Sequence, residues 1–136
     1  MTSASRREVI LRNGTVSYQK VILKVREHRI PLRLKRHLAP RTVRLVLSKL
    51  PMSGNVHRHG SMIYINTEIN AGLERGRKTL AAGSVAFLPG QKCLCFVLQD
   101  HTPGRLMTPM GEMEGDYGVL DQLESGDILH VYEETG

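Results

Sequence analysis

Apolar and polar residues alternate in two neighbouring stretches near the start of the chain, 21–26 and 29–35. The apolar positions on one face are Val21, Leu23 and Val25 in the first stretch and Ile30, Leu32 and Leu34 in the second. A repeat of two residues is typical of a strand that buries one face and leaves the other in solvent. The two stretches therefore predict a pair of half-buried strands.

A hairpin is predicted before them by Asn13-Gly14, which separates the stretches 8–12 and 15–18. Asn-Gly favours a tight turn because both residues tolerate a positive φ angle. Residues 1–7 are polar and basic, and we assign them to a flexible N-terminal tail. The length of 136 residues is that of one ordinary domain, which we place at 8–136.

The hydrophobic period changes after Ala39 from that of a strand to that of a helix. Apolar residues now recur three and four positions apart, at Val43, Val46, Leu47 and Leu50. Pro40 suits the first turn of a helix, and Pro51 ends it. The single apolar stripe predicts one helix that packs its buried side on a core.

Strand patterns return later in the chain, at 61–67, 83–88, 93–99, 107–114 and 126–133, with a short helical turn within 116–125. In the 107–114 strand, simple alternation places Met107 and Met113 on one face and Met110 on the other. Many short strands and a lone helix favour a closed barrel, because closure removes exposed strand edges. The predicted fold is mainly β: a closed antiparallel β-barrel of about eight strands with one capping α-helix and a short helical turn.

Charge is distributed unevenly between the two halves of the chain. Residues 1–60 contain 14 Lys and Arg but 2 Asp and Glu, whereas residues 61–136 contain 5 and 11. If strands from the two halves interleave, opposite charges meet across the ladders of the sheet. The basic stretch 26–44 also leaves open a nucleic-acid accessory protein, because Lys and Arg clusters bind polyanions. The stretch has no recognition-helix or RNP-type motif, so nucleic acid is the less favoured partner.

The cysteine pattern and the hydropathy bear on the cellular compartment. Cys93 and Cys95 are two residues apart on a predicted strand, where their side chains point to one face and suit no disulfide. We expect buried free thiols and a cytoplasmic protein. The basic N-terminal residues show no signal-peptide pattern, and no apolar run reaches the length of a membrane span, so we expect no membrane partner.

Four stretches, taken in order, carry a resemblance to a known family. They are Ala39-Pro40-Arg41-Thr42-Val43, Gly60–Ile65, Ala82–Phe96 running on to His101-Thr102-Pro103, and Leu123–Asp127. Together they resemble the small, uncharacterised cyclophilin-like proteins of bacteria and archaea, over about residues 20–133. The resemblance implies a cyclophilin-like barrel with a helix over one open end. Ser84 and His59 depart from the pattern, since the family usually has Asp and often has Trp at these places.

The resemblance also implies a candidate site. True cyclophilins catalyse prolyl cis/trans isomerisation with an arginine that hydrogen-bonds the prolyl nitrogen, and Arg58 in Val56-His57-Arg58 matches that residue. The cyclophilin signature around that arginine continues with Phe-Met-x-Gln-Gly-Gly-Asp. Met62 falls roughly where its methionine would lie, but no Gln-Gly-Gly-Asp follows here. The resemblance implies an apolar pocket for a small ligand or proline-containing peptide, with weak peptidyl-prolyl isomerase activity as its sharpest form. Arg58 is the candidate catalytic residue, and the candidate lining residues are Met62, Tyr64, Phe87 and Phe96.

A metal-dependent, cupin-like enzyme is the other open reading. His57 and His59 form a His-x-His, which on a strand aims both imidazoles to one side and suits a transition metal. No carboxylate lies between His59 and Glu68, so His101 or His130 would have to complete the ligand set. The histidines are the only metal candidates, and we expect no cofactor. Whether the chain is an enzyme stays open, and both a monomer and a homodimer are compatible with the sequence.

Overall fold

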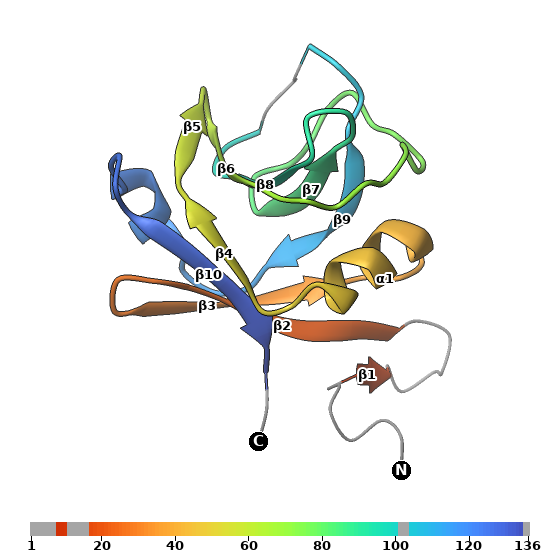
Figure 1. Cartoon of the computed structure of the whole chain (residues 1–136), viewed down its shortest axis with the longest axis horizontal. Helices are drawn as coiled ribbons and strands as arrows, with labels where there is room; N and C mark the ends of the chain where they lie inside the picture. The colour runs from red at the N-terminus through yellow and green to blue at the C-terminus, as the bar shows by residue number, and fades with distance from the viewer. Residues whose placement is uncertain (1–7, 11–16, 101–103, 135–136) are drawn as a thin grey trace.

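The computed structural model describes residues 8–10, 17–100 and 104–134. Ten strands of these residues form one antiparallel sheet that curls into a nearly closed barrel (Figure 1). They are β1 (Glu8–Ile10), β2 (Ser17–Val25), β3 (His28–Leu34), β4 (Met52–Asn55), β5 (His57–His59), β6 (Met62–Asn66), β7 (Ser84–Leu88), β8 (Cys93–Val97), β9 (Thr108–Met113) and β10 (Ile128–Glu133). The predicted mainly β, antiparallel barrel is confirmed.

The strand order explains how the barrel closes. The ladder runs β4-β10-β2-β3-β9-β7-β8-β6-β5, with β1 paired to β2 outside this path. Its two end strands follow each other in the chain, and β4 packs against β6. A Cβ atom on Gly54 would lie 3.2 Å from the Cβ of Ile65, so the two strands meet closely here. Side-chain packing between β4 and β6 therefore brings the two edges of the sheet together.

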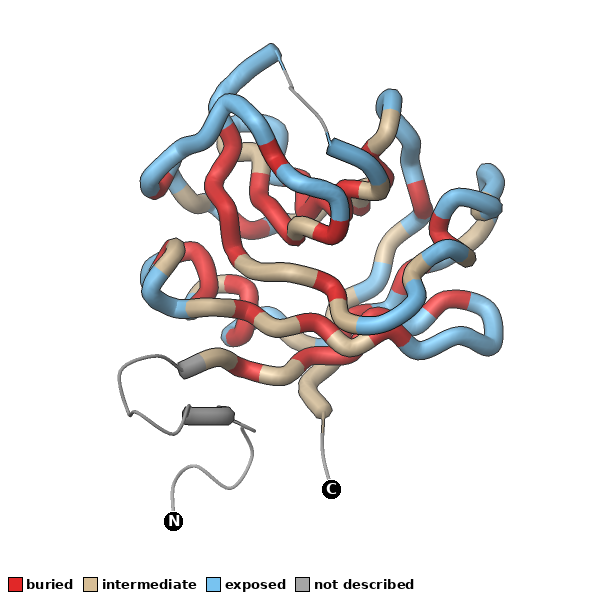
Figure 2. The backbone as a smooth tube through the Cα atoms, turned by 180° about the vertical axis from the view of Figure 1, so that it is seen from behind, coloured by how far each residue is buried: buried red, intermediate tan, exposed pale blue. Residues whose placement is uncertain are grey.

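The core fills the barrel, and the helix covers one of its ends. α1 (Pro40–Ser48) buries Val43, Val46 and Leu47 in the same cluster as the inward side chains of the strands. The buried stretches run along the middle of the strands, whereas the turns are exposed (Figure 2). The predicted capping helix is confirmed, and so is the short helical turn, the 3-10 turn η2 (Gly118–Gln122).

Several strands differ from the sequence prediction. β2 is continuous from Ser17 to Val25, and its pairing with β1 confirms a hairpin. The predicted Asn13-Gly14 turn and the 1–7 tail lie outside the described residues. The short strands β4 and β5 were not expected as separate elements.

A register shift in β9 overturns one prediction about the methionines. Val85 of β7 pairs with Gly111 and the next residue, Ala86, pairs with Pro109, so Met110 is the extra residue of a bulge. Because a bulge interrupts strict alternation, Met110 and Met113 both enter the barrel core. Met107 instead joins a second apolar cluster. The prediction that Met107 and Met113 share a face was wrong for this reason.

The charges of the two halves meet across the sheet, as the interleaved arrangement predicted. Cations of residues 1–60 pair with carboxylates of residues 61–136 in Lys20–Glu134, Arg26–Asp127, Arg33–Glu112, Arg33–Glu114, Lys35–Glu112, Arg41–Glu74 and Arg58–Asp121. Much of the basic stretch 26–44 is therefore neutralised within the fold.

Candidate functional site

The wall formed by β6, β7 and β8 is apolar on both of its faces. Residues paired across these strands share a face. The inner face presents Ile63, Ile65, Val85, Phe87, Leu94 and Phe96 to the barrel core. The outer face presents a second cluster of Met62, Ala86, Cys93, Cys95 and Val97. Leu80 and Met107, from irregular segments that lie over this wall, complete the second cluster.

A pocket opens over this second cluster, and we call it the outer pocket. Its volume is about 190 Å³, and its lining residues are His59, Met62, Tyr64, Leu88, Gln91, Cys93, Cys95, Gly104, Arg105 and Met107. Met62, Leu88 and Met107 make part of the lining apolar, whereas Gln91 and Arg105 bring polar groups to it. The pocket thus combines an apolar lining with donors for a polar group.

The charged group that lines the outer pocket is positive. Arg105 supplies a guanidinium, and none of the lining residues is a carboxylate. Burial raises the pKa of the Cys95 thiol to about 12, with a smaller contribution from Cys93. Burial also raises the pKa of Cys93. Both cysteines are free and buried, as the sequence predicted, and they remain neutral thiols at physiological pH.

A carboxylate from the irregular segment 67–83 ties that segment to the barrel. The residue before α1 is Ala39, which has no capping side chain, and Glu74 takes this place instead. One oxygen of Glu74 accepts hydrogen bonds from the backbone N–H and the hydroxyl of Thr42, both at 2.7 Å. The other accepts from the backbone N–H of Arg41 at 3.2 Å. The N–H of Glu74 donates to the Thr108 hydroxyl at 3.0 Å, so this segment is tied to both α1 and β9.

Glu74 is held in its charged form by these contacts. Burial acts to raise the pKa of Glu74, but the hydrogen bonds from Thr42 and Arg41 outweigh burial and the net pKa is lowered. The position of Glu74 at the N-terminus of α1 also favours its charged form, because the first N–H groups of a helix lack partners within the helix.

Arg58 lies away from the outer pocket. It pairs with Ile63 in the β5–β6 ladder, so its side chain leaves the strand on the face opposite to Met62. Its guanidinium contacts the Asp121 carboxylate and donates to the Asp121 carbonyl at 3.2 Å. Arg58 lines a different pocket, of about 260 Å³, together with Val56, His57, Ile63, Leu123, Glu124 and Ser125. We call this the Arg58 pocket.

The four predicted lining residues also divide between the two faces. Met62 and Tyr64 line the outer pocket. Phe87 and Phe96 are fully buried in the barrel core, on the face that Arg58 shares with Ile63. Strand alternation therefore separates the two phenylalanines from Met62 and Tyr64, which reach the pocket.

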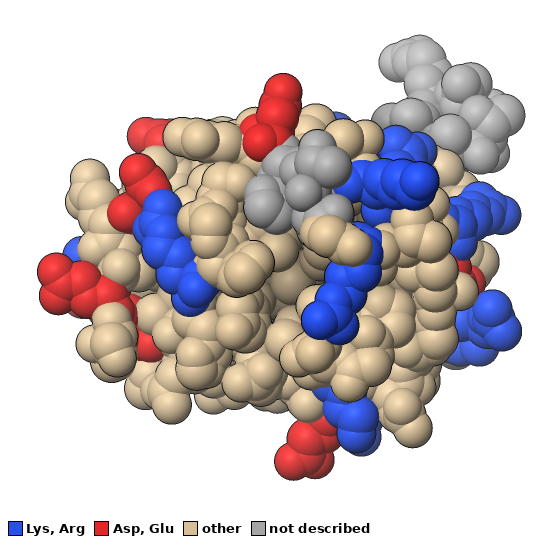
Figure 3. Space-filling model, turned by 90° about the horizontal axis from the view of Figure 1, so that it is seen from above, with Lys and Arg blue, Asp and Glu red and all other residues tan. Residues whose placement is uncertain are grey.

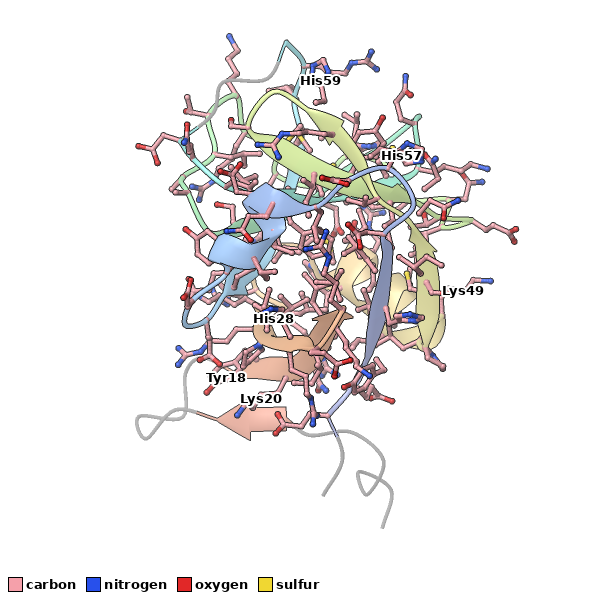
Figure 4. All side chains as sticks on the ribbon, turned by 90° about the vertical axis from the view of Figure 1, so that its left-hand side faces the viewer. Tyr18, Lys20, His28, Lys49, His57 and His59 are labelled. Carbon is pink, nitrogen blue, oxygen red and sulfur yellow. The ribbon has the colours of Figure 1, made fainter. Side chains whose placement is uncertain are left out.

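His57 and His59 lie two residues apart on β5 (Figure 4). Their side chains therefore leave the same side of the strand, but their surroundings differ. His57 stacks on Tyr64 with ring centroids 5.2 Å apart and lies 3.3 Å from the Asn66 side-chain nitrogen. His59 lines the outer pocket. His101 lies outside the described residues, and His130 is on β10, paired with Ser53 and Lys24. Over the described ranges, no group of three or more His, Cys, Asp or Glu side chains could hold a metal ion.

Sequence reasoning missed most of the pocket wall. Cys93 and Cys95 were placed on one face, but nothing in the sequence showed that this face was the one shared with Met62 and Tyr64. That information lies in the β6–β8 register, which pairs Tyr64 with Cys95. Arg105 and Gly104 come from an irregular segment with no periodic signal.

The fold and this site define a nearly closed antiparallel barrel with one capping helix and a small pocket on its outer wall. The chain belongs to the Cyclophilin-like family, whose model matches residues 19–131. A hypothetical protein of Archaeoglobus fulgidus, known from its solution structure, has a TM-score of 0.73 and 20% sequence identity, covering 85% of this chain and 94% of its own. This likeness supports the fold. Comparison with curated proteins found no match. Over the described residues, no helix has the length and apolar character needed to cross a membrane.

Proposed function

We propose that the protein binds a short peptide segment and accepts one apolar side chain or ring of that segment in the outer pocket. The observation that carries the proposal is the pocket itself, in which Met62, Leu88 and Met107 form an apolar wall beside Arg105. Its volume of about 190 Å³ is below the roughly 300–1,000 Å³ of sites that enclose a whole small molecule. A pocket of this size suits a single proline ring or aliphatic side chain.

The chemistry of the lining supports a peptide as the ligand. Methionine thioethers are flexible and adapt to apolar groups of different shape. Gln91 and Arg105 supply N–H donors, which a peptide carbonyl accepts. The family resemblance supports a proline-containing segment, because a cyclophilin pocket holds a prolyl ring. The free, buried cysteines further support a protein that works in a reducing compartment such as the cytoplasm.

The test is a titration with the blocked peptide acetyl-Ala-Ala-Pro-Ala-amide. We expect saturable binding that Met62→Ala weakens about tenfold, which corresponds to about 1.4 kcal/mol. Met52→Ala is the matched control, because Met52 lines a different groove beside Lys49 and Ile69. If Met62→Ala fails to fold, Arg105→Ala is the alternative variant, since Arg105 is exposed. Absence of binding at millimolar protein, or equal weakening by Met52→Ala, would overturn the proposal.

Weak prolyl isomerisation is the second candidate function. The specific observation that favours it is a guanidinium, that of Arg105, in the apolar pocket, where it could donate to a prolyl nitrogen. The alternative arginine, Arg58, would require the ring to bind in the Arg58 pocket. Acceleration of isomerisation that is lost in Arg105→Ala assigns the activity to the outer pocket, and loss in Arg58→Ala assigns it to the Arg58 pocket. No acceleration at high protein concentration would exclude both.

A further inference from the structure

We propose that the peptide segment taken by the outer pocket is acidic, with Asp or Glu flanking the apolar residue that enters the pocket. This inference rests on the proposed function and adds the partner chemistry. Three observations support it. Three cations lie beside the pocket, the nearby carboxylates are bound to other groups, and two exposed leucines extend the apolar surface.

The three cations are Arg77, Lys78 and Arg105. Arg105 lines the pocket. Arg77 is joined to the lining residue Met107 by two backbone hydrogen bonds, of 2.9 Å from its N–H and 3.1 Å to its carbonyl. Lys78 follows Arg77, and all three residues are exposed. Among the ion pairs that the described residues form, none involves these cations, in contrast to Arg33 and Lys35 on the sheet.

The carboxylates nearest in sequence are already engaged. Glu74 is buried, and its oxygens accept hydrogen bonds from Thr42 and Arg41 at the start of α1. Asp100 accepts a hydrogen bond from the backbone N–H of Ala82 at 2.8 Å and does not line the pocket. Glu112 lines a separate groove with Arg77, and it is paired there with Arg33 and Lys35. Within the described part of the chain, none of these three carboxylates forms an ion pair with a cation beside the pocket. The positive charge there is therefore available to a ligand.

Two leucines continue the apolar surface outward from the pocket. Leu73 is 43% exposed and Leu106 is 41% exposed, and both are large apolar side chains in contact with solvent. They converge on Gly76: a Cβ atom there would lie 2.9 Å from the Cδ atoms of Leu73 and 3.1 Å from the Cβ of Leu106. Leu106 lies between Arg105 and Met107, so this pair adjoins the pocket wall directly. We call Leu73 and Leu106 the leucine pair.

The charge pattern selects the occupant. In the view from above, the charged side chains on the right-hand half of the visible face are mainly Lys and Arg (Figure 3). An apolar pocket, an exposed leucine pair and three cations without carboxylate partners match a segment in which apolar and acidic residues are mixed. Complementary charge across an interface speeds association and disfavours partners of the wrong sign. A basic segment would place like charges beside these cations.

The test compares three peptides of one length: acetyl-Glu-Ala-Pro-Leu-Glu-amide and its analogues with Gln or Lys in place of both Glu residues. At low salt we expect the Glu peptide to bind about three- to tenfold more tightly than the Gln peptide, because each exposed charge pair contributes little. The Lys peptide should bind more weakly still. Screening in about 1 M salt, where the Debye length is about 3 Å, should bring the affinities of the Glu and Gln peptides together.

Two variants locate the charge effect. In the double variant Lys78→Gln, Arg105→Gln, the ratio of Glu-peptide to Gln-peptide affinity should fall toward one. The matched control is Lys24→Gln, Arg29→Gln, which removes two cations at opposite positions of the β2–β3 ladder. This variant should keep the ratio.

Equal affinities for the Glu and Gln peptides in the wild-type protein would overturn the inference and leave the proposed function standing. No binding of any peptide would overturn the proposed function itself. Tighter binding of a short oligothymidylate than of the Glu peptide would show that the cations serve a nucleic acid instead, and would also overturn the inference.

Discussion

Arg58 lies directly opposite Ile63 in the β5–β6 ladder, whereas its neighbour His59 lies opposite Met62. Because alternate residues of a strand point to opposite faces, this register places Arg58 and Met62 on different sides of the barrel wall. The arginine and the methionine that resemble parts of one cyclophilin signature therefore belong to two pockets.

Replacing Arg58 by alanine tests this separation. We expect Arg58→Ala to leave the affinity of the outer pocket for acetyl-Ala-Ala-Pro-Ala-amide within a factor of about two, and to change the free energy of unfolding by less than about 1 kcal/mol, because its ion pair with Asp121 is exposed. Calorimetric titration and urea denaturation measure the two quantities. A loss of affinity comparable to that of Met62→Ala would place both residues in one site.

Gly111 is the position of the barrel most sensitive to an added methyl group. A Cβ atom there would lie 1.8 Å from the carbonyl oxygen of Arg33 on β3. We expect Gly111→Ala to lower the free energy of unfolding by more than about 3 kcal/mol, since the backbones of β3 and β9 must move apart. The control is Gly72→Ala, where no atom lies within 4 Å of the new carbon. Similar stabilities of the two variants in urea denaturation would contradict this packing.

Glu74 should make stability depend on acid pH. Its pKa in the folded protein is below the ordinary value, so its contribution is complete above the unfolded pKa of about 4.3 and is lost as the pH falls through the lower folded value. We expect Glu74→Gln to cost about 1–3 kcal/mol at pH 7 and to flatten the change of stability at acid pH. Thermal denaturation between neutral and acid pH gives both results.

The matched control for Glu74 is Glu27→Gln, which removes an exposed carboxylate in the turn between β2 and β3. This variant should keep the acid dependence of the wild-type protein. If Glu74→Gln retains the full acid dependence, the carboxylate does not cap α1 as described.

The two cysteines should be slow to react in the folded protein. With its pKa raised to about 12 by burial, Cys95 holds almost no thiolate at pH 8, and the thiolate is the reactive form. In the variant Cys93→Ser, we expect iodoacetamide to label Cys95 at least about a hundredfold more slowly than in urea. Mass spectrometry follows the labelling. Equal rates in the folded and unfolded protein would show that Cys95 is accessible and ionised.

The parts of the fold that follow a simple period could be predicted from the sequence. The alternation of Ile30, Leu32 and Leu34 gave β3, and the spacing of Val43, Val46 and Leu47 gave α1. The opposite charges of the two halves indicated that charges could meet across interleaved strands, and the ion pair of Lys35 with Glu112 is one that the fold forms. Each of these features follows from the pattern of apolar or charged residues along the sequence.

The features that escaped prediction depend on register or on irregular backbone. The strand 52–55 has the sequence Met-Ser-Gly-Asn. Ser, Gly and Asn are typical of turns, so the sequence did not indicate a strand that pairs with β10. The bulge at Met110 breaks the alternation by which its face was assigned. The outer pocket needs the pairing of Tyr64 with Cys95 and the position of Arg105 in an irregular segment, and neither is encoded in a local pattern.

The most direct test of the outer pocket is a nuclear magnetic resonance titration of the whole protein with acetyl-Ala-Ala-Pro-Ala-amide. We expect the amide signals that shift to cluster at His59, Met62, Cys95 and Met107, around the outer pocket. Shifts clustered instead at Arg58, Leu123 and Ser125, or no shifts at millimolar peptide, would contradict the assignment of the outer pocket as the binding site.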